Sequence, residues 1–403
     1  MFLVDPVRLA RRQIEIDRDR TARFPHLMAH KAARMMASPL ALLRGSAPLF
    51  YALLERHPEL AQGPAGEGWI VGDAHVENFG AFRVGALTVR ETLRSHAKEA
   101  IVFDLNDFDD SLVAPWRLDV LRLVTSLLLA GRESGDGSAA LTQADALLEA
   151  YVGAAFGTKR APPQPRCVVA LVEKVRRRTR KQLLDARTRE VSGQRRFVLG
   201  PRYELLPPKL RAKAERSFGK YARRLPQSAS VPPEALEVLD AAFRVAGTGS
   251  LGGLRIALLV RGKGGLDGGW IFDMKAEGPP SAACLAPEPE LDPGDRVCAA
   301  LRACLARYPR MMGSARLRGE SMFVRRLAPQ EDKLDLSCVP PEDRVPLARH
   351  LGALLGAAHR RGVTRAPKAA WSAKQCARLL HRAVALAGIH EAMYLAYCDL
   401  VRR

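Results

Sequence analysis

The apolar pattern of the chain changes twice along its length, and this change most constrains the fold. Apolar residues recur at helical spacing from Arg8 to Leu60, and again over 116–131 and 139–156. After Leu236 they give way to short β-branched and aromatic runs, and from Asp343 the helical spacing returns. Helices at both ends and strands in the centre predict an α+β protein.

The expected elements can be located by residue. Central strands are expected at 243–245, 254–260, 270–275 and 322–327, and C-terminal helices at 347–361 and 373–400. Two more strand-like runs, 69–71 and 100–105, each lead into a polar loop. Because 403 residues exceed the usual size of one core, more than one lobe is expected. We predict a helical part at 1–235 that carries both polar loops, a β-rich part at 236–335, and helices at 336–403 that complete the first part.

Composition narrows the classes of partner and compartment. The formal net charge of +20 attracts anionic partners, but the excess of arginine over lysine is common in GC-rich genomes, so nucleic acid is not favoured. Seven scattered cysteines without a C-x-x-C pair argue against structural zinc and a disulfide framework. Residues 1–20 lack the apolar core of a signal peptide, and no apolar run reaches the roughly 18 residues of a membrane span. We expect a cytoplasmic protein.

The segment 173–196 is rich in arginine and lysine and has a partial apolar face. A solvated helix is the expected structure. The alternative is an anion-binding wall for a phosphorylated substrate. The sequence leaves its role open.

Two acidic loops follow the strand-like runs of the first part. Gly72–Asn78 holds an acid, Asp73, and an amide, Asn78, five positions apart, and Asn106–Asp110 holds Asp107. Phosphoryl transfer needs a carboxylate that accepts the proton of the attacking hydroxyl, and a carboxylate and an amide oxygen that hold Mg²⁺ against the phosphates. Asp73, Asp107 and Asn78 supply this set, although Asp and Asn also favour ordinary turns.

The neighbours of these residues are ambiguous. Asp104, Asp109 and Asp110 are expected to be solvated loop acids, with a second metal ligand as the alternative. His75 is expected to hydrogen-bond the loop backbone, with a catalytic part as the alternative. Arg34 and Arg44 are expected either to bind phosphate or to form structural ion pairs, and the sequence does not decide between these roles.

A full G-x-G-x-x-G motif occupies Gly247–Gly252. A dinucleotide-binding fingerprint runs from strand to helix, whereas the apolar runs here predict strand, loop, strand. In that arrangement backbone amides cover the nucleotide phosphates, and the predicted phosphate-binding residues are Gly247, Gly249, Ser250 and Gly252.

Lys275 ends the next predicted strand, at a sensible distance from the glycine loop for a lysine that pairs with the α- and β-phosphates. A surface lysine at a strand end is the alternative. Its acidic partner is expected to be Glu288, Glu290 or Asp295.

The acidic loops resemble those of the aminoglycoside and choline kinase branch of the protein-kinase-like superfamily. The shared pattern is D-x-x-x-x-N, then an Asp-aromatic pair after an apolar strand, then Asp119 twelve residues beyond Asp107. The resemblance implies that Asp73 is the catalytic-loop aspartate, Asn78 the metal-binding asparagine and Asp107 the metal-chelating aspartate. Two departures are Val71, where a histidine is common, and a long spacing to Asp107 that implies an insertion around 90–98.

The order of the motifs also departs from that superfamily, in which the glycine loop and lysine precede the catalytic loop. Here they follow it. A circular permutation accounts for this order, and His350–His359 resembles the helix that normally runs into the catalytic loop. The resemblance implies a two-lobed, circularly permuted kinase-like fold with a mostly helical large lobe and a small antiparallel-sheet lobe.

Most of the chain is also similar to an uncharacterised bacterial family, domain of unknown function 2252. The similarity lies in 34–39 with 43–45, 72–80, 103–109 and 245–252, together with Lys275. It implies that these motifs belong together, but it names no substrate.

These residues predict a phosphotransferase that uses ATP and Mg²⁺ to phosphorylate a hydroxyl of an unidentified small molecule or protein, with Asp73 as the base. One alternative is a metal-dependent phosphoesterase, since Gly72–His75 resembles a two-metal loop; the other histidines do not cluster as such a site requires. Another is a catalytically inactive kinase-like module that binds an anionic or nucleic-acid partner. The acceptor and the oligomeric state are not predicted.

Overall fold

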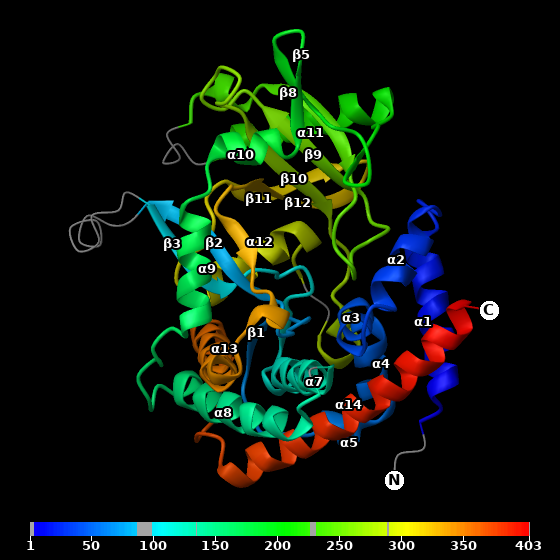
Figure 1. The fold of residues 1–403 in the computed structure, drawn as a ribbon, viewed down its shortest axis with the longest axis vertical. Helices are drawn as coiled ribbons and strands as arrows, with labels where there is room; N and C mark the ends of the chain where they lie inside the picture. Colours follow the sequence, from blue (N-terminus) through cyan, green and yellow to red (C-terminus); the bar gives the residue numbers. More distant parts are fainter. Residues whose placement is uncertain (1–3, 87–98, 134, 226–230, 288–289, 403) are drawn as a thin grey trace.

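The N-terminal segment is helical, as expected. The computed structural model describes residues 4–86, 99–133, 135–225, 231–287 and 290–402 (Figure 1). Its first helices are α1 (Pro6–Thr21), α2 (Leu27–Met35), α3 (Pro39–Gly45), α4 (Ala47–Arg56) and α5 (Pro58–Ala61). Asp5 begins α1 by accepting hydrogen bonds from two backbone amides, and Ser38 begins α3 in the same way with one.

The later helices form a packed layer at the opposite end of the molecule from the largest sheet (Figure 1). They are α7 (Arg117–Glu133), α8 (Gly137–Ala155), α13 (Pro341–Arg361) and α14 (Ala373–Arg402), close to the predicted bounds. Helix α13 packs along α8, and α14 packs against α7 and α1. A Cβ at Gly352 or Gly356 would lie 2.2 or 2.4 Å from a carbonyl oxygen of α8, so these glycines permit the close contact.

The central region forms a six-stranded antiparallel sheet in the order β11-β12-β10-β9-β8-β7. Its strands are β7 (Tyr203–Glu204), β8 (Val238–Arg244), β9 (Arg255–Val260), β10 (Trp270–Ala276), β11 (Met312–Leu317) and β12 (Glu320–Leu327). The predicted central strands correspond to β8, β9, β10 and β12, although β8 begins earlier than expected and β7 and β11 were not predicted. Side chains alternate between the two faces: Ile256, Phe272 and Met274 pack with helix α11 (Pro208–Arg224), while Asp273 and Lys275 face the other way.

Smaller sheets carry the acidic loops. Strand β1 (Glu67–Ile70) lies between β14 (Val363–Arg365) and β4 (Leu112–Pro115), and it leads into the loop of Asp73. Strands β2 (Phe79–Ala86) and β3 (Glu99–Leu105) pair beside β13 (Glu331–Lys333), and β3 leads into the loop of Asp107. The expected insertion around 90–98 lies outside the described residues.

Buried apolar residues form two main clusters. One lies among the helices and includes Leu54, Leu121 and Leu355, and the other lies between the six-stranded sheet and α11. Helix α12 (Pro293–Cys304) contributes Val297 and Leu301 to the helical cluster, although it lies between two sheet strands in sequence. Helix α12 therefore connects the sheet region to the helical core.

The prediction of one solvated helix over 173–196 is wrong. The segment contains the end of α9 (Arg166–Arg176), then α10 (Arg180–Asp185), then a hairpin of β5 (Thr188–Val191) and β6 (Gln194–Phe197). Thr179 and Gln182 form a capping box that starts a new helix. Ser192 and Gly193, both at positive φ, turn the hairpin, a geometry that matches the twist of paired strands.

Helix α14 is the one helix among the described residues that is long and apolar enough to cross a membrane by length and composition, with 33% of the relevant window buried. Its buried side chains, among them Leu386, Met393 and Tyr397, pack within the apolar clusters.

Candidate active site

The turn after β1 brings the two acidic loops together. Gly72 has φ of +80°, and a Cβ there would lie 1.9 Å from the carbonyl oxygen of Asp110. Only glycine combines this backbone conformation with so close an approach. The turn therefore places Asp73 against the loop that holds Asp107.

One face of helix α7 fixes the Asp73 loop, through residues spaced i, i+3 and i+7: Asp119, Arg122 and Ser126. The Asp119 carboxylate accepts hydrogen bonds from the backbone N–H groups of Val71 (2.6 Å) and Gly72 (2.9 Å). The Ser126 hydroxyl accepts one from the N–H of Val76 (3.0 Å). The backbone on both sides of Asp73 is thus anchored to a buried helix.

Asp119 also links α7 to α13. Its carboxylate lies 3.1 Å from Nε2 of His359, whose Nδ1 lies 2.8 Å from the hydroxyl of Tyr151. All three side chains are buried. The helix that precedes β14 is therefore bonded to the same carboxylate that fixes the turn at Gly72.

Asp73 is paired with a buried arginine that sequence reasoning did not identify. Nε of Arg122 donates to the Asp73 carboxylate at 2.6 Å, its Nη2 donates to the carbonyl of Leu43, and its guanidinium lies over the ring of Phe50. Burial raises the pKa of Asp73 to about 7; Arg122 opposes this rise, and Asp110 and Asp107 add to it. A carboxyl group that titrates near neutral pH can accept a proton from a substrate hydroxyl.

Asn78 lies between the two acidic residues. Its Nδ2 donates to the carbonyls of Asp73 (2.9 Å) and Asp107 (3.4 Å), while its buried Oδ1 has no hydrogen-bond partner among the described residues. For Asp107, burial raises the pKa, but Lys275 and Lys333 outweigh it and hold the pKa below the usual value. The site therefore offers an amide oxygen without a partner and an ionised carboxylate.

These two oxygens fit Mg²⁺, which binds proteins through one or two carboxylates while phosphates and water complete its shell. Among the described residues, no group of three or more His, Cys, Asp and Glu side chains is arranged to hold a metal ion. A fully protein-made metal cage is thus not found in that part of the chain, and the fit rests on Asn78 and Asp107.

His75 follows the expected bonding. Its Nδ1 accepts a hydrogen bond from the N–H of Glu77 at 3.2 Å. Burial lowers its pKa well below the usual value, and the nearby cations Arg44 and Lys333 lower it further, so the ring stays neutral. The side chain also lines the cavity described below.

The glycine motif forms the predicted loop between two antiparallel strands, β8 and β9. Gly247 and Gly252 have φ of +87° and +105°, and a Cβ at Gly252 would lie 2.5 Å from the carbonyl oxygen of Arg20. The loop therefore packs against the end of α1.

Cations of the N-terminal helices bind the carbonyl groups of this loop. Nη1 of Arg20 donates to Gly249 O at 2.8 Å, and Nζ of Lys31 donates to Thr248 O and Gly249 O at 3.0 Å each. Lys31 is buried and lies 3.4 Å from Asp17. Sequence reasoning missed this anchor, although Lys31 occupies a buried helical position midway between Leu27 and Met35.

The sequence did not decide the roles of Arg34 and Arg44, and in the structure these two residues have different partners. Arg34 donates to the carbonyl of Gly247, so it belongs to the same anchor. Arg44 forms an ion pair with Glu77, and within the described part of the chain its buried Nε has no hydrogen-bond partner.

Of the predicted acidic partners of Lys275, Glu290 and Asp295 are wrong. Its Nζ pairs with Asp109 and lies 3.5 Å from Glu277, whereas Asp295 accepts a hydrogen bond from Ser314. Glu290 is exposed, and position 288 lies outside the described residues. Glu277 lies beside Lys275 because residues two positions apart along a strand point to the same side.

Asp109 and Asp110 are accordingly not free solvated acids. Asp110 accepts hydrogen bonds from the N–H and the hydroxyl of Ser281, both at 2.8 Å. Asp104 accepts one from the N–H of Leu105, and burial raises its pKa to about 6.

Arg296 on α12, also missed from the sequence, fixes this second loop. It is buried, and its Nη2 donates to the carbonyls of Asp109 (2.9 Å) and Gly278 (3.0 Å), while its Nη1 donates to the carbonyl of Ser111. The carbonyls of the acidic loop and those of the segment after Lys275 are therefore bound to one side chain.

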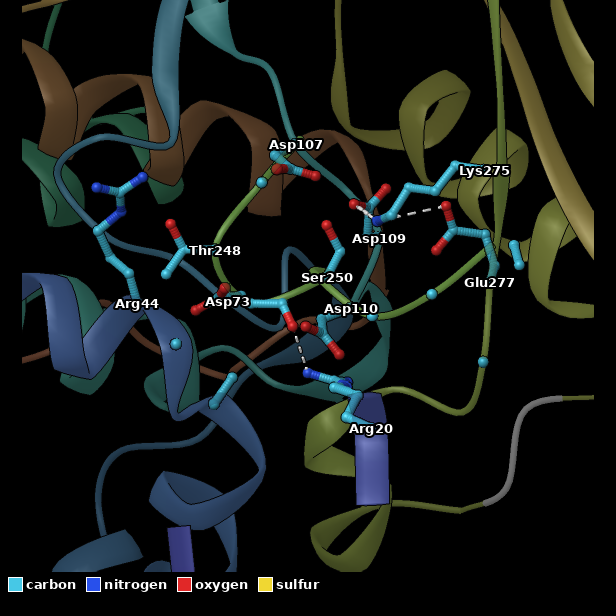
Figure 2. Close-up of a pocket in the computed structure, with 18 of the residues that line it drawn as sticks. Arg20, Arg44, Asp73, Asp107, Asp109, Asp110, Thr248, Ser250, Lys275 and Glu277 are labelled. Carbon is cyan, nitrogen blue, oxygen red and sulfur yellow. Dashed lines mark hydrogen bonds and ion pairs between the residues drawn. The ribbon is translucent and has the colours of Figure 1, made fainter. Parts of the chain in front are cut away.

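All the predicted site residues meet in one cavity of about 490 Å³, and several of them surround a common space in Figure 2. It is lined by both acidic loops, by the glycine loop and by Lys275. The predicted site residues that line it are Asp73, Asn78, Asp107, Gly247, Gly249, Ser250, Gly252 and Lys275. Their catalytic, metal-binding and phosphate-binding roles stay predictions.

The fold and site define an α+β protein whose cleft gathers two acidic loops, a glycine loop and a lysine. The chain belongs to the family described as an uncharacterized protein conserved in bacteria (DUF2252), whose family model matches residues 23–400. No curated protein and no solved structure matches the chain. Membership of this family, expected from the motifs, is confirmed.

Proposed function

We propose that this protein is a Mg²⁺- and ATP-dependent phosphotransferase that phosphorylates a hydroxyl group of an unidentified acceptor. The observation that carries the proposal is the convergence of Asp73, Asn78 and Asp107 with the glycine loop and Lys275 in one cavity. Carboxylate and amide oxygens on one side and a glycine loop with a lysine on the other match the needs of phosphoryl transfer.

The proposal includes a two-lobed, circularly permuted kinase-like arrangement, with a large lobe of 1–235 and 336–403 and a small lobe of 236–335. The pairing of β14 with β1 supports it, because the N–H of Trp69 donates to Gly362 O at 2.8 Å. The end of α13 thus lies beside the strand that enters the Asp73 loop. In the superfamily that this site resembles, the corresponding helix runs into that loop directly.

In the proposed reaction, Asp73 accepts the proton of the acceptor hydroxyl. The hydroxyl oxygen forms a bond to the γ-phosphorus while the bond to the β-phosphate oxygen breaks, so that ADP leaves and no covalent enzyme intermediate forms. Arg122 fixes the orientation of the Asp73 carboxylate. The rate gain comes from positioning and from charge stabilisation.

Asn78 Oδ1 and the Asp107 carboxylate are the proposed Mg²⁺ ligands. When bound there, Mg²⁺ neutralises negative charge on the phosphates. Lys275, held by Asp109 and Glu277, is placed to pair with the phosphates, and amides of the glycine loop cover them. A nucleotide and a small-molecule or protein acceptor are the proposed partners, and the cytoplasm is the proposed location.

Thermal stabilisation by Mg²⁺ and ATP tests the proposal. A ligand at 100 times its dissociation constant raises the free energy of unfolding by about 2.7 kcal/mol. We expect this gain for the wild type, its loss in Asp107→Ala, and its retention in Asp145→Ala, since Asp145 is exposed on α8 outside the cavity. The absence of any shift in the wild type would refute the proposal.

A further inference from the structure

A second cavity, of about 350 Å³, adjoins the first beneath the glycine loop. The two share Asp107, Gly247 and Lys275 among their lining residues. The floor of the second cavity is the face of the six-stranded sheet that does not pack against α11. This position makes it an extension of the proposed nucleotide site.

The floor of this cavity is charged. Asp273 on β10 lies opposite Arg325 on β12 in the antiparallel register, and it forms ion pairs with Arg244 (2.6 Å) and Arg255 (2.5 Å). Burial raises the pKa of Asp273, but the two arginines outweigh it and keep the pKa well below the usual value. One ionised carboxylate therefore faces two guanidinium groups.

Two guanidinium donors of this cavity have no acceptor among the described residues. They are the buried Nε of Arg244, on the floor, and the buried Nη1 of Arg187, which follows α10. Arg325 is bonded to Glu331 at 3.2 Å. Buried N–H groups without acceptors are costly, and planar guanidinium groups match the oxygens of a phosphate.

The charged floor of the cavity disfavours the binding of an apolar ring against it. A purine stacked there would cover ion pairs and leave the free N–H donors without acceptors, whereas phosphate oxygens would accept from them. The apolar lining of the cavity comes from its walls, among them Phe82 on β2, Leu301 on α12 and Phe323 on β12.

We propose that the second cavity binds an oligophosphate group through Arg187, Arg244 and Arg255. This inference rests on the proposed function, because the phosphates belong either to the nucleotide, inserted ahead of its base, or to a phosphorylated acceptor. Both sources present the same anion to the same guanidinium groups.

Inorganic tripolyphosphate without Mg²⁺ is the probe. We expect it to raise the melting temperature of the wild type, and its affinity to fall about tenfold or more in Arg187→Met and in Arg244→Met, since each removes a charge-assisted donor. Removal of Arg244 from its buried pair can prevent folding. Among the described residues Arg187 has no carboxylate partner, so Arg187→Met keeps the test valid.

Two controls separate the site from general attraction to a basic protein. Arg261→Met removes an exposed arginine outside the cavity, paired with Glu237, and should leave tripolyphosphate binding unchanged. Asn78→Ala, which lines the first cavity and not the second, should keep tripolyphosphate binding although it weakens the response to Mg²⁺ and ATP. The second control therefore distinguishes failure of this inference from failure of the proposed function.

Competition then identifies the source of the phosphates. Mutual exclusion of ATP and tripolyphosphate assigns the cavity to the nucleotide's own phosphates, and additive shifts assign it to a phosphorylated acceptor. The inference is overturned if tripolyphosphate gives no shift, if Arg187→Met binds it as the wild type does, or if Arg261→Met loses as much affinity as Arg187→Met.

Discussion

At the residue scale, the ionisation of Asp73 should control the pH dependence of the proposed reaction. Its pKa is raised to about 7, chiefly by burial, and only the deprotonated carboxylate accepts a proton. We expect kcat/KM to rise about tenfold per pH unit below this pKa and to level off above it. In Asp73→Asn the rising limb should vanish and kcat should fall by roughly 10²–10⁴.

The same variant separates an enzyme from an inactive binding module. An asparagine side chain has nearly the same shape as aspartate, so stabilisation by Mg²⁺ and ATP should persist in Asp73→Asn while turnover is lost. Calorimetry for binding and a coupled assay of ADP release measure the two effects. A rate unaffected by this substitution would show that Asp73 is not the base.

Arg122 sets how far the pKa of Asp73 rises. Its cation opposes the effect of burial, so Arg122→Met should raise that pKa further and move the pH–rate limb to higher pH. Removal of one partner of a buried ion pair should also lower the free energy of unfolding by about 3–5 kcal/mol. Denaturant titration and the pH–rate profile measure the two consequences.

Arg117 provides a matched control on the same helix. It donates to the carbonyl of Ala61 at 2.8 Å and does not line the cavity. Arg117→Met should destabilise the protein less and leave the pH–rate limb in place. If both variants shift the limb equally, Arg122 acts on the fold in general and not on Asp73.

At the element scale, the glycine loop is built as a fixed strand-to-strand connection, held from outside by the N-terminal helices. Three cations, Arg20, Lys31 and Arg34, bind its carbonyls. With the carbonyl groups engaged by these helices, the loop's conformation depends on residues more than 200 positions earlier in the chain. The loop and α1 to α2 therefore act as one unit.

Two adjacent glycines test this unit. Gly252→Ala places a Cβ at positive φ and 2.5 Å from Arg20 O, so it should cost about 1–3 kcal/mol of stability and weaken ATP binding. Gly253 lacks a positive φ, and a Cβ there would lie 3.4 Å from Ser250 O, an ordinary contact distance. Gly253→Ala should be nearly neutral, and equal effects in thermal melts of the two variants would contradict the proposed contact.

The sequence predicted elements better than contacts between them. The period of the apolar residues located β8, β9, β10, α7, α8 and α13, and the glycines located the loop, because these signals are local. Lys31 and Arg122 were missed because their partners are distant carbonyl and carboxylate groups, which leave no local pattern. Their one signal is a cation among the apolar residues of a buried helix, as Lys31 shows between Leu27 and Met35.

The errors have the same origin. The partners of Lys275 depend on how the Asp107 loop meets the sheet, which spacing along the chain does not determine. The segment 173–196 was predicted as one helix on the basis of its charged residues. Two local signals within it, the capping box at Thr179 and the turn at Gly193, were overlooked. The residue types of the candidate site were predictable because the proposed phosphoryl transfer requires so few of them, and their roles stay predictions.

At the scale of the whole molecule, charge acts on folding and on ligand binding with opposite signs. The formal net charge of +20 destabilises the compact state through self-repulsion, while the same field favours the binding of a polyanion such as the proposed nucleotide. Between about 0.01 and 0.15 M salt, the Debye length falls from roughly 30 to 8 Å, which screens both effects.

We therefore expect NaCl in this range to raise the melting temperature of the ligand-free protein and to weaken the binding of ATP at fixed Mg²⁺. Calorimetric melts and titrations at several salt concentrations measure the two trends, and sucrose at matched osmolarity controls for effects unrelated to charge. A melting temperature that falls with salt would show that ion pairs such as those of Asp273 outweigh the net repulsion. If added salt raises the melting temperature and lowers the affinity for ATP, the net charge destabilises the folded protein and favours the binding of ATP.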